Sequence, residues 1–151
     1  MGLQGHKDSI EDIQFSPEHE NVLATCSCDQ TIKLWDLRAT QQKPTLSFIA
    51  SDCDINVMSW NSQIKFLLAS GDDKGEFRVW DLRMVKQAAS SLSKGQTFKD
   101  AQSITRIRWH TKPITSIQFE PREDSVLAVA SDDDKLTWWD FSVEVDESET
   151  V

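Results

Sequence analysis

An eight-residue pattern occurs three times in this chain, and each copy contains a Trp-Asp pair. The copies are TIKLWDLR at residues 31–38, EFRVWDLR at 76–83 and KLTWWDFS at 135–142. Apolar and polar residues alternate up to the Trp-Asp pair, which indicates a β-strand that runs into a turn. The pairs lie 45 and then 59 residues apart, and the longer interval contains an insertion after Arg83. The chain is therefore a set of three related units.

Each copy is preceded by two further stretches with the composition of strands, and in two units a fourth strand follows. The predicted strands are 9–15, 21–27, 31–38 and 45–50 in the first unit, 55–60, 66–71, 76–83 and 103–109 in the second, and 113–119, 125–131 and 135–142 in the third. Four strands repeated about every 40–45 residues, with Trp-Asp ending the third, are typical of β-propeller blades. We therefore expect an all-β fold, a β-propeller fragment of about three blades.

The units divide the chain into blade one (residues 5–50), blade two (51–109), an incomplete blade three (110–142) and an acidic tail (143–151). Blade two contains a long insertion at 84–102 that is rich in Ser, Lys and Gln and has no clean period. We expect a long surface loop there, with only a weak indication of a helix at 84–89. Because blades pack face to face, the two end blades should expose apolar faces, and we expect self-association through them.

The composition limits the classes of protein to which the chain can belong. It has 151 residues, 38% of them apolar, and no run approaches the roughly 20 apolar residues of a membrane span. We therefore expect a soluble, intracellular domain with no membrane partner. Its three cysteines, Cys26, Cys28 and Cys53, form neither an even disulfide framework nor a metal-ligand spacing. We expect them to be small packing residues.

The net charge of −9 bears on the kind of partner. A strongly acidic chain repels phosphate backbones, which argues against direct nucleic-acid binding. An acidic surface suits a basic protein partner instead, although the same charge could serve only to keep the domain in solution. The sequence shows no Gly-rich phosphate loop, metal-ligand spacing or nucleophile motif. We therefore expect no enzymatic activity, no cofactor and no metal.

The repeated units resemble WD-repeat β-propeller proteins over residues 5–145. Among these proteins, the chain is most similar to the branch that contains the retinoblastoma-binding histone chaperones and the glutamate-rich WD-repeat chaperone of ribosome assembly. The segments that carry the similarity are GHKDSIEDIQFSP, SCDQTIKLWDLR, INVMSW, SGDDKGEFRVWDLR, ITSIQFEP and WDFSVEVD. Complete propellers close about 4–8 blades into a ring, so we expect the sequence to be either a piece of a longer protein or a truncated product.

This resemblance implies a protein-binding scaffold or chaperone that acts on a basic ribosomal protein during large-subunit ribosome biogenesis. It also implies a location in the nucleus, and more narrowly in the nucleolus. Two alternatives stay open. One is a histone-binding subunit of a chromatin complex, in which the basic partner is a histone tail, and the other is a general scaffold for several proteins. The sequence separates these functions only by resemblance.

The resemblance further implies one buried hydrogen-bond network in each blade. In blade one its members are His6, Thr25, Asp29 and Trp35. A carboxylate only accepts hydrogen bonds and an indole N–H only donates, whereas imidazole and hydroxyl groups do both. A chain from Asp to His to Thr to Trp can therefore satisfy every member. These are also catalytic-triad residue types, but no nucleophile motif accompanies them, and we expect a structural role.

Blade two carries an imperfect copy of this network. The hydroxyl and the indole are kept, as Ser70 and Trp80. Ser51 stands at the histidine position and Lys74 at the aspartate position, so the adjacent Asp73 is the expected replacement.

Blade three has a different defect. It keeps its imidazole, carboxylate and indole, as His110, Asp133 and Trp139. Val129 stands at the hydroxyl position, so the expected network lacks a link there. Blade one should therefore be the most completely bonded of the three.

We expect partner binding on the loops that precede the inner strands and on the turns between second and third strands, because these should emerge on one face of the arc. The acidic residues predicted to contact a partner are Asp8, Glu11, Asp52, Asp54, Asp72 and Asp132. The sequence indicates no structural role for four of them, namely Asp52, Asp54, Asp72 and Asp132. The resemblance singles out Glu11, because histone-binding relatives place an acidic residue there against a basic tail.

Overall fold

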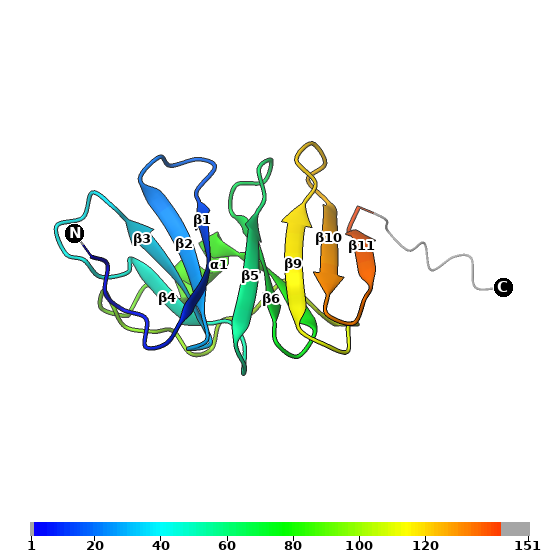
Figure 1. Cartoon of the computed structure of the whole chain (residues 1–151). Helices are drawn as coiled ribbons and strands as arrows, with labels where there is room; N and C mark the ends of the chain where they lie inside the picture. The colour runs from blue at the N-terminus through cyan, green and yellow to red at the C-terminus, as the bar shows by residue number, and fades with distance from the viewer. Residues whose placement is uncertain (1, 143–151) are drawn as a thin grey trace.

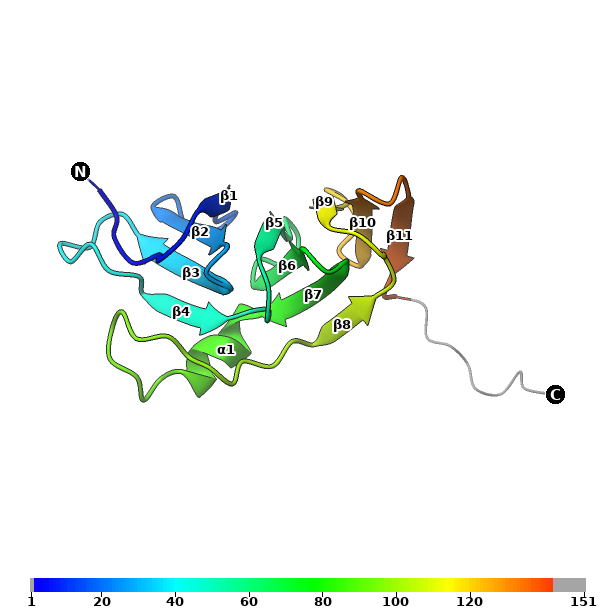
Figure 2. The ribbon, with the colours of Figure 1, turned by 60° about the horizontal axis from the view of Figure 1, so that its bottom comes forward.

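The computed structural model describes residues 2–142, and the predicted acidic tail at 143–151 lies outside the described residues. In this range the chain forms three antiparallel sheets of four, four and three strands that stand side by side as an arc (Figures 1 and 2). The predicted all-β fold of about three blades is therefore confirmed. No helix in this range is long and apolar enough to cross a membrane.

Each blade is a simple meander in which every strand pairs with its neighbour in sequence. Blade one consists of β1 (Ile10–Phe15), β2 (Val22–Ser27), β3 (Thr31–Asp36) and β4 (Leu46–Ile49). Blade two consists of β5 (Ile55–Trp60), β6 (Leu67–Asp72), β7 (Glu76–Asp81) and β8 (Thr105–Arg108). Blade three consists of β9 (Ile114–Phe119), β10 (Val126–Ser131) and β11 (Leu136–Asp140). The inner strands β1, β5 and β9 lie along one side of the arc, and β4 and β8 along the other (Figure 2).

Two apolar cores fill the spaces between successive blades. The core between blades one and two includes Ile32, Phe48, Met58, Leu68 and Trp80. The core between blades two and three includes Ala69, Phe77, Ile117, Leu127 and Val129. Successive side chains of a strand point to opposite faces, so β6 serves both cores, with Leu68 in the first and Ala69 in the second. Burial of each large apolar side chain stabilises the arc by about 1.5–3 kcal/mol.

Polar side chains also connect the inner strands of successive blades. The Asp12 carboxylate on β1 accepts a hydrogen bond from the Met58 backbone N–H on β5 at 2.8 Å. The Ser59 hydroxyl on β5 accepts one from the Phe119 backbone N–H on β9 at 2.9 Å. An inner strand is the edge of its sheet, and amides on that edge have no ladder partner of their own. The two contacts satisfy such amides and fix each inner strand against the next.

The insertion in blade two is more ordered than the surface loop that the sequence predicts. It begins with α1 (Leu82–Ala88), whose Leu82 and Val85 side chains are buried in the first core. The chain then passes along the outer edge of blade one beside β4 (Figure 2). There Phe98 accepts a hydrogen bond from the Ile49 N–H at 2.9 Å and donates one to the Ser47 carbonyl at 2.7 Å. The insertion therefore fastens blade two to blade one.

The two outer faces of the arc carry exposed apolar side chains. On blade one, Ile13 and Phe15 are 55% and 63% exposed. On blade three, Leu136 and Trp138 are 74% and 71% exposed. Trp138 belongs to this outer face because its sequence neighbour Trp139 points the other way, into the second core.

Candidate functional site

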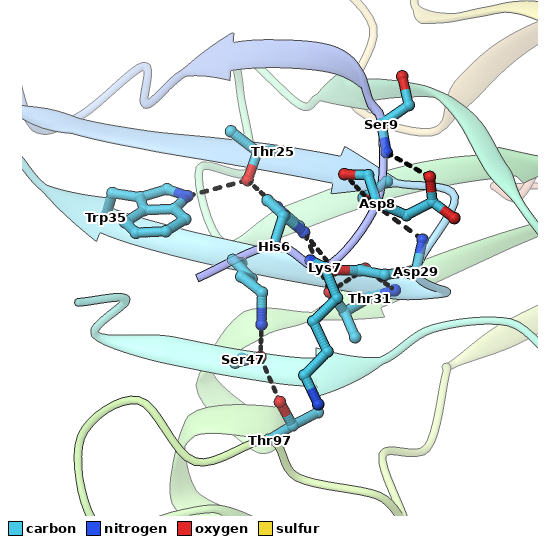
Figure 3. Close-up of polar contacts among 12 residues, drawn as sticks. His6, Lys7, Asp8, Ser9, Thr25, Asp29, Thr31, Trp35, Ser47 and Thr97 are labelled. Carbon is cyan, nitrogen blue, oxygen red and sulfur yellow. Dashed lines mark hydrogen bonds and ion pairs between the residues drawn. The ribbon is translucent and has the colours of Figure 1, made fainter. Parts of the chain in front are cut away.

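Four side chains of blade one form a continuous chain of hydrogen bonds (Figure 3). The Trp35 indole N–H donates to the Thr25 hydroxyl at 2.9 Å, and that hydroxyl lies 2.6 Å from His6 Nε2. On the other side of the ring, His6 Nδ1 lies 2.8 Å from the Asp29 carboxylate. Because an indole only donates and a carboxylate only accepts, the hydroxyl donates to Nε2 and Nδ1–H donates to the carboxylate. The structure thus brings together the four residues predicted for this network.

Asp29 is the charged end of this chain. Burial alone would raise the pKa of its carboxyl group, but hydrogen bonds from Thr31, from the Lys7 N–H and from His6 outweigh burial and lower the pKa to about 2. Burial lowers the pKa of His6 below its usual value, although Asp29 opposes that shift. The imidazole is therefore neutral near pH 7 and can donate on one side and accept on the other.

Blade two replaces the histidine with the shorter Ser51 and moves its carboxylate. The Ser51 hydroxyl donates to Asp72 at 2.8 Å, and Asp72 also accepts the backbone N–H groups of Lys74 and Glu76. The prediction of Asp73 for this role is wrong, because Asp73 is exposed while Asp72 is buried. The prediction that Asp72 contacts a partner is wrong for the same reason. A serine hydroxyl reaches less far than an imidazole, so the carboxylate lies at the end of β6 rather than in the turn.

The other half of the blade-two network is separate. The Trp80 indole N–H donates to the Ser70 hydroxyl at 2.9 Å. No hydrogen bond in the described part of the chain joins this pair to Ser51 and Asp72. Blade two therefore holds its Trp-Asp strand and its entry loop through two short contacts instead of one continuous chain.

Blade three closes its network through a residue that the sequence analysis did not select. His110 Nδ1 lies 3.0 Å from the Asp133 carboxylate, and His110 Nε2 lies 3.0 Å from the Thr137 hydroxyl. The Trp139 indole N–H donates to the same hydroxyl at 3.0 Å. The expectation of a missing link at Val129 is therefore wrong. Thr137 lies two residues before Trp139, so the two side chains share one face of β11, and that spacing is the signal that could have found it.

The entry loops and the turns between second and third strands meet in the same way in all three blades. At each junction, a backbone N–H in the turn donates to a carbonyl of the entry loop at 3.0 Å: Cys28 to Ser9, Asp73 to Asp54, and Asp132 to Pro113. These loops lie along the lower edge of the arc in Figure 1. We call this surface the loop edge, and it comprises residues 5–11, 28–30, 50–54, 73–75, 110–113 and 132–134.

Glu11 and Asp54 come together at the Cys28 thiol on the loop edge. The register of β1 against β2 shifts between Ile10 and Asp12, so Glu11 sits in a β-bulge, which re-aims its side chain. Cys28 Sγ lies 3.4 Å from Glu11 Oε1. Partial burial raises the pKa of this thiol, and the carboxylates of Asp54 and Glu11 raise it further, to about 12. The thiol is therefore protonated and lies beside two negative charges from adjacent blades.

Each blade places one lysine among the carboxylates of the loop edge: Lys7, Lys74 and Lys112. Asp52 forms an ion pair with Lys74 at 3.0 Å, so the expectation that it has no structural partner is wrong. Asp132 is exposed on the blade-three part of the loop edge, which also carries Lys112. Asp8 is exposed at the entry to blade one. Every blade therefore contributes acidic groups to the loop edge, and among the six predicted partner-binding residues only Asp52 forms an ion pair within the described range.

A family model described as "WD domain, G-beta repeat" matches residues 1–36 and 101–140. The first match ends at the Trp-Asp pair of blade one, and the second covers β8 and blade three. The chain belongs to the WD-repeat family. The resemblance predicted from the sequence is therefore confirmed, and the matched segments contain the complete histidine networks of blades one and three.

This WD-repeat chain is similar to much longer proteins. It is 42% identical over 145 residues to "Ribosome assembly protein rrb1" of Schizosaccharomyces pombe, which covers 95% of this chain and 28% of that protein. It is 44% identical over 145 residues to "Protein HEAT STRESS TOLERANT DWD 1" of Arabidopsis thaliana, covering 96% of this chain and 28% of that protein. A third relative, "Histone-binding protein MSI1" of Saccharomyces cerevisiae, is 26% identical over 145 residues, which cover 95% of this chain and 31% of that protein. The chain thus spans less than a third of these relatives.

The histidine networks of this WD-repeat chain lie in the interior of the blades. The side chains of His6 and His110 are only 3% and 0% exposed, and both ring nitrogens of each imidazole are used within the networks. Within residues 2–142, no group of three or more His, Cys, Asp or Glu side chains is arranged to hold a metal ion. The networks tie each entry loop to its blade, and the loop edge presents the charged groups to solvent.

Proposed function

We propose that this chain binds a basic protein segment at the loop edge, with Glu11 and Asp54 as the charged centre. The observation that carries the proposal is that both carboxylates act on the Cys28 thiol, which lies 3.4 Å from Glu11 Oε1, and that neither has an ion-pair partner among residues 2–142. Like charges held close together repel, and a Lys or Arg side chain placed between them removes that repulsion. The pair is therefore suited to a cationic side chain of a partner.

We propose further that the longer protein is a chaperone for a basic ribosomal protein during assembly of the large ribosomal subunit, and that it works in the nucleus and nucleolus. Two observations support this. One relative is named a ribosome assembly protein and is 42% identical. The net charge of −9 suits partners that are themselves rich in Lys and Arg and repels nucleic acid. The role is one of binding and not of catalysis, because the triad-type residues are buried in the blade networks.

A histone tail is the second candidate partner. It is supported by the similarity to a protein named for histone binding, at the lower identity of 26%. A histone tail and a basic ribosomal segment present the same Lys and Arg chemistry to the loop edge, so the carboxylate pair favours neither. Direct comparison of the two ligands is needed to separate them.

Surface plasmon resonance on the immobilised chain tests the proposal. The analytes are a Lys/Arg-rich peptide from a large-subunit ribosomal protein, a histone H3 tail peptide and a scrambled neutral peptide, each at low and at physiological salt. We expect both basic peptides to bind, with affinity that falls steeply as salt rises, because counter-ions screen exposed charges over about 8–10 Å. Tighter binding of the ribosomal peptide supports the first candidate, and tighter binding of the histone peptide supports the second. Binding of neither, or binding that is independent of salt, rejects a charge-driven role.

A further inference from the structure

Lys33 of β3 is a buried cation in an acidic protein. Its relative exposure is 3%, and its ammonium group donates a hydrogen bond to the Ser47 hydroxyl at 2.5 Å. The Ser47 hydroxyl in turn contacts the Thr97 hydroxyl of the insertion at 2.8 Å (Figure 3). A buried charge is costly unless an opposite charge or a full set of hydrogen bonds compensates it. A single neutral hydroxyl is weak compensation for an ammonium group with three donors.

In blade two, the residue at the position that matches Lys33 is also a cation, and a carboxylate compensates its charge. Arg78 precedes Trp80 by two residues, as Lys33 precedes Trp35, and Arg78 Nε lies 2.6 Å from Glu76 Oε1. In blade one the position of Glu76 is taken by Thr31, whose hydroxyl and N–H are both used on Asp29. Lys33 forms no ion pair within the described range. Lys33 therefore lacks the direct carboxylate contact that Arg78 has, and the attraction of Asp29 does not outweigh the burial that lowers the pKa of Lys33.

A cavity of about 750 Å³ lies against Lys33. Its walls come from three places: the entry loop of blade one with Lys7, the β3 and β4 strands, and the insertion at residues 95–100 with Lys99. The bonds between Phe98 and β4 hold the insertion wall in place. Asp29 and Asp100 also line the cavity, but the oxygens of Asp29 are already occupied by His6, Thr31 and the Lys7 N–H. The volume falls in the range of roughly 300–1,000 Å³ that is usual for small-ligand sites.

We propose that this cavity binds an oxyanion, a phosphoryl or carboxylate group, through the ammonium groups of Lys33, Lys7 and Lys99. The anion supplies the counter-charge that Glu76 supplies to Arg78 in blade two. Lys7 and Lys33 are positive charges on two walls of the cavity, and an anion between them removes their mutual repulsion. Lysine ammonium groups are common ligands of phosphate. The insertion then has a role, because it forms the third wall and carries Lys99. This site is separate from the acidic loop edge.

Nuclear magnetic resonance titration of the ¹⁵N-labelled full chain tests this proposal. The probes are inorganic phosphate, O-phosphoserine, a phosphoserine peptide and sodium acetate, all at constant ionic strength. We expect saturable shifts of the backbone amides of Thr31, Ser47, Thr97 and Phe98 with at least one probe. Stronger binding of the peptide than of inorganic phosphate assigns the anion to a protein partner, and the reverse order assigns it to a small molecule. The absence of any saturable shift overturns the proposal.

Variants show whether the lysines bind the anion. Lys33→Met keeps the length of the side chain and removes its charge, and Lys7→Gln changes an exposed residue with little risk to the fold. We expect each to weaken binding at least tenfold, whereas Lys65→Gln, an exposed lysine in the β5–β6 loop, should leave it unchanged. Equal binding by Lys7→Gln and the parent overturns the proposal even where Lys33→Met fails to fold.

Discussion

Val129 and Thr137 face each other across the β10–β11 ladder, and in this pair the network hydroxyl has changed strands. The corresponding pair in blade one is Thr25 and Lys33, where the hydroxyl lies on the second strand instead of the third. Cross-strand partners lie on the same face of a sheet, so either of them can reach the histidine and the tryptophan. Blade three therefore keeps its network with a valine at the usual hydroxyl position.

The first prediction follows from this exchange. Thr137→Val should leave the His110 imidazole and the Trp139 indole without their shared partner, which costs about 1–3 kcal/mol of unfolding free energy. The double variant Val129→Thr/Thr137→Val restores a hydroxyl on the neighbouring strand and should recover at least half of that loss. Urea unfolding of the parent, both single variants and the double variant gives the coupling energy. Purely additive effects would show that the two positions do not substitute for each other.

The fold was predictable because its signal is local and repeated. Alternation before each Trp-Asp pair located the third strand of each blade, and the composition of the flanking stretches located the others. In the structure β2 and β6 are buried along almost their whole length. The helix α1 was harder to predict. Both Trp-Asp-Leu-Arg segments bind the backbone N–H of their arginine through the aspartate, yet only the second continues as a helix. Burial of Val85 in a core that forms only between blades decides the difference.

The candidate site was predictable only in part. Glu11 and Asp54 were selected separately, but their meeting at Cys28 depends on the β-bulge and on the stacking of two blades, neither of which appears as a motif. Asp72 was predicted to contact a partner because the sequence indicates no structural role for it, and the register of the strands places it opposite Ile55, as Ser27 lies opposite Ile10. Only the geometry of a shortened side chain at position 51 shows why a carboxylate is needed there.

The second prediction compares the networks of blades one and two. His6→Ala removes one hydrogen-bond partner from Thr25 and one from Asp29, and we expect a loss of about 1–3 kcal/mol in unfolding free energy. Ser51→Ala should cost less, because it breaks one contact with a network carboxylate, whereas His6→Ala breaks two network bonds. Guanidinium titrations of the two variants beside the parent provide the measurement. Equal losses would mean that blade one is not the more completely bonded blade.

The third prediction concerns pH. Burial holds the folded-state pKa of His6 below its usual value of about 6.5, so the unfolded chain binds a proton more readily and stability should fall as pH drops below about 6.5. The folded-state pKa of Asp29 is about 2, so its contribution is present above the unfolded value and is lost as pH falls from about 4 toward 2. The urea midpoint should change less steeply with pH near pH 6 in His6→Gln than in the parent. Below about pH 4, the urea midpoint should likewise change less steeply with pH in Asp29→Asn than in the parent. Slopes that match the parent in both variants would contradict the assignment.

The fourth prediction concerns the outer faces of the arc. Leu136 and Trp138 expose large apolar surfaces on blade three, and Ile13 and Phe15 do so on blade one. We expect the chain to self-associate through these faces, and Leu136→Glu/Trp138→Glu should shift it toward the monomer. Light scattering over a range of concentrations checks this. The control is Glu20→Lys/Glu123→Lys, a double change at exposed loop residues that should leave self-association unchanged. A parent chain that stays monomeric at high concentration would reject self-association.

The central claim is that the carboxylates of Glu11 and Asp54 bind a basic partner, and charge reversal tests it most directly. In Glu11→Lys/Asp54→Lys, the on-rate for a Lys/Arg-rich ribosomal or histone peptide at low salt should fall about tenfold or more, because loss of charge complementarity acts mainly on association. Unfolding free energy should change by less than about 0.5 kcal/mol if the pair has no structural role.

The matched control is Glu20→Lys/Glu123→Lys, which makes the same change in net charge on loops at the opposite edge of the arc. Surface plasmon resonance of the parent and both variants, at low and at physiological salt, is the deciding measurement. The account predicts weak binding by the loop-edge variant and near-parental binding by the control. Parental binding by the loop-edge variant, or equal losses in both variants, would contradict it.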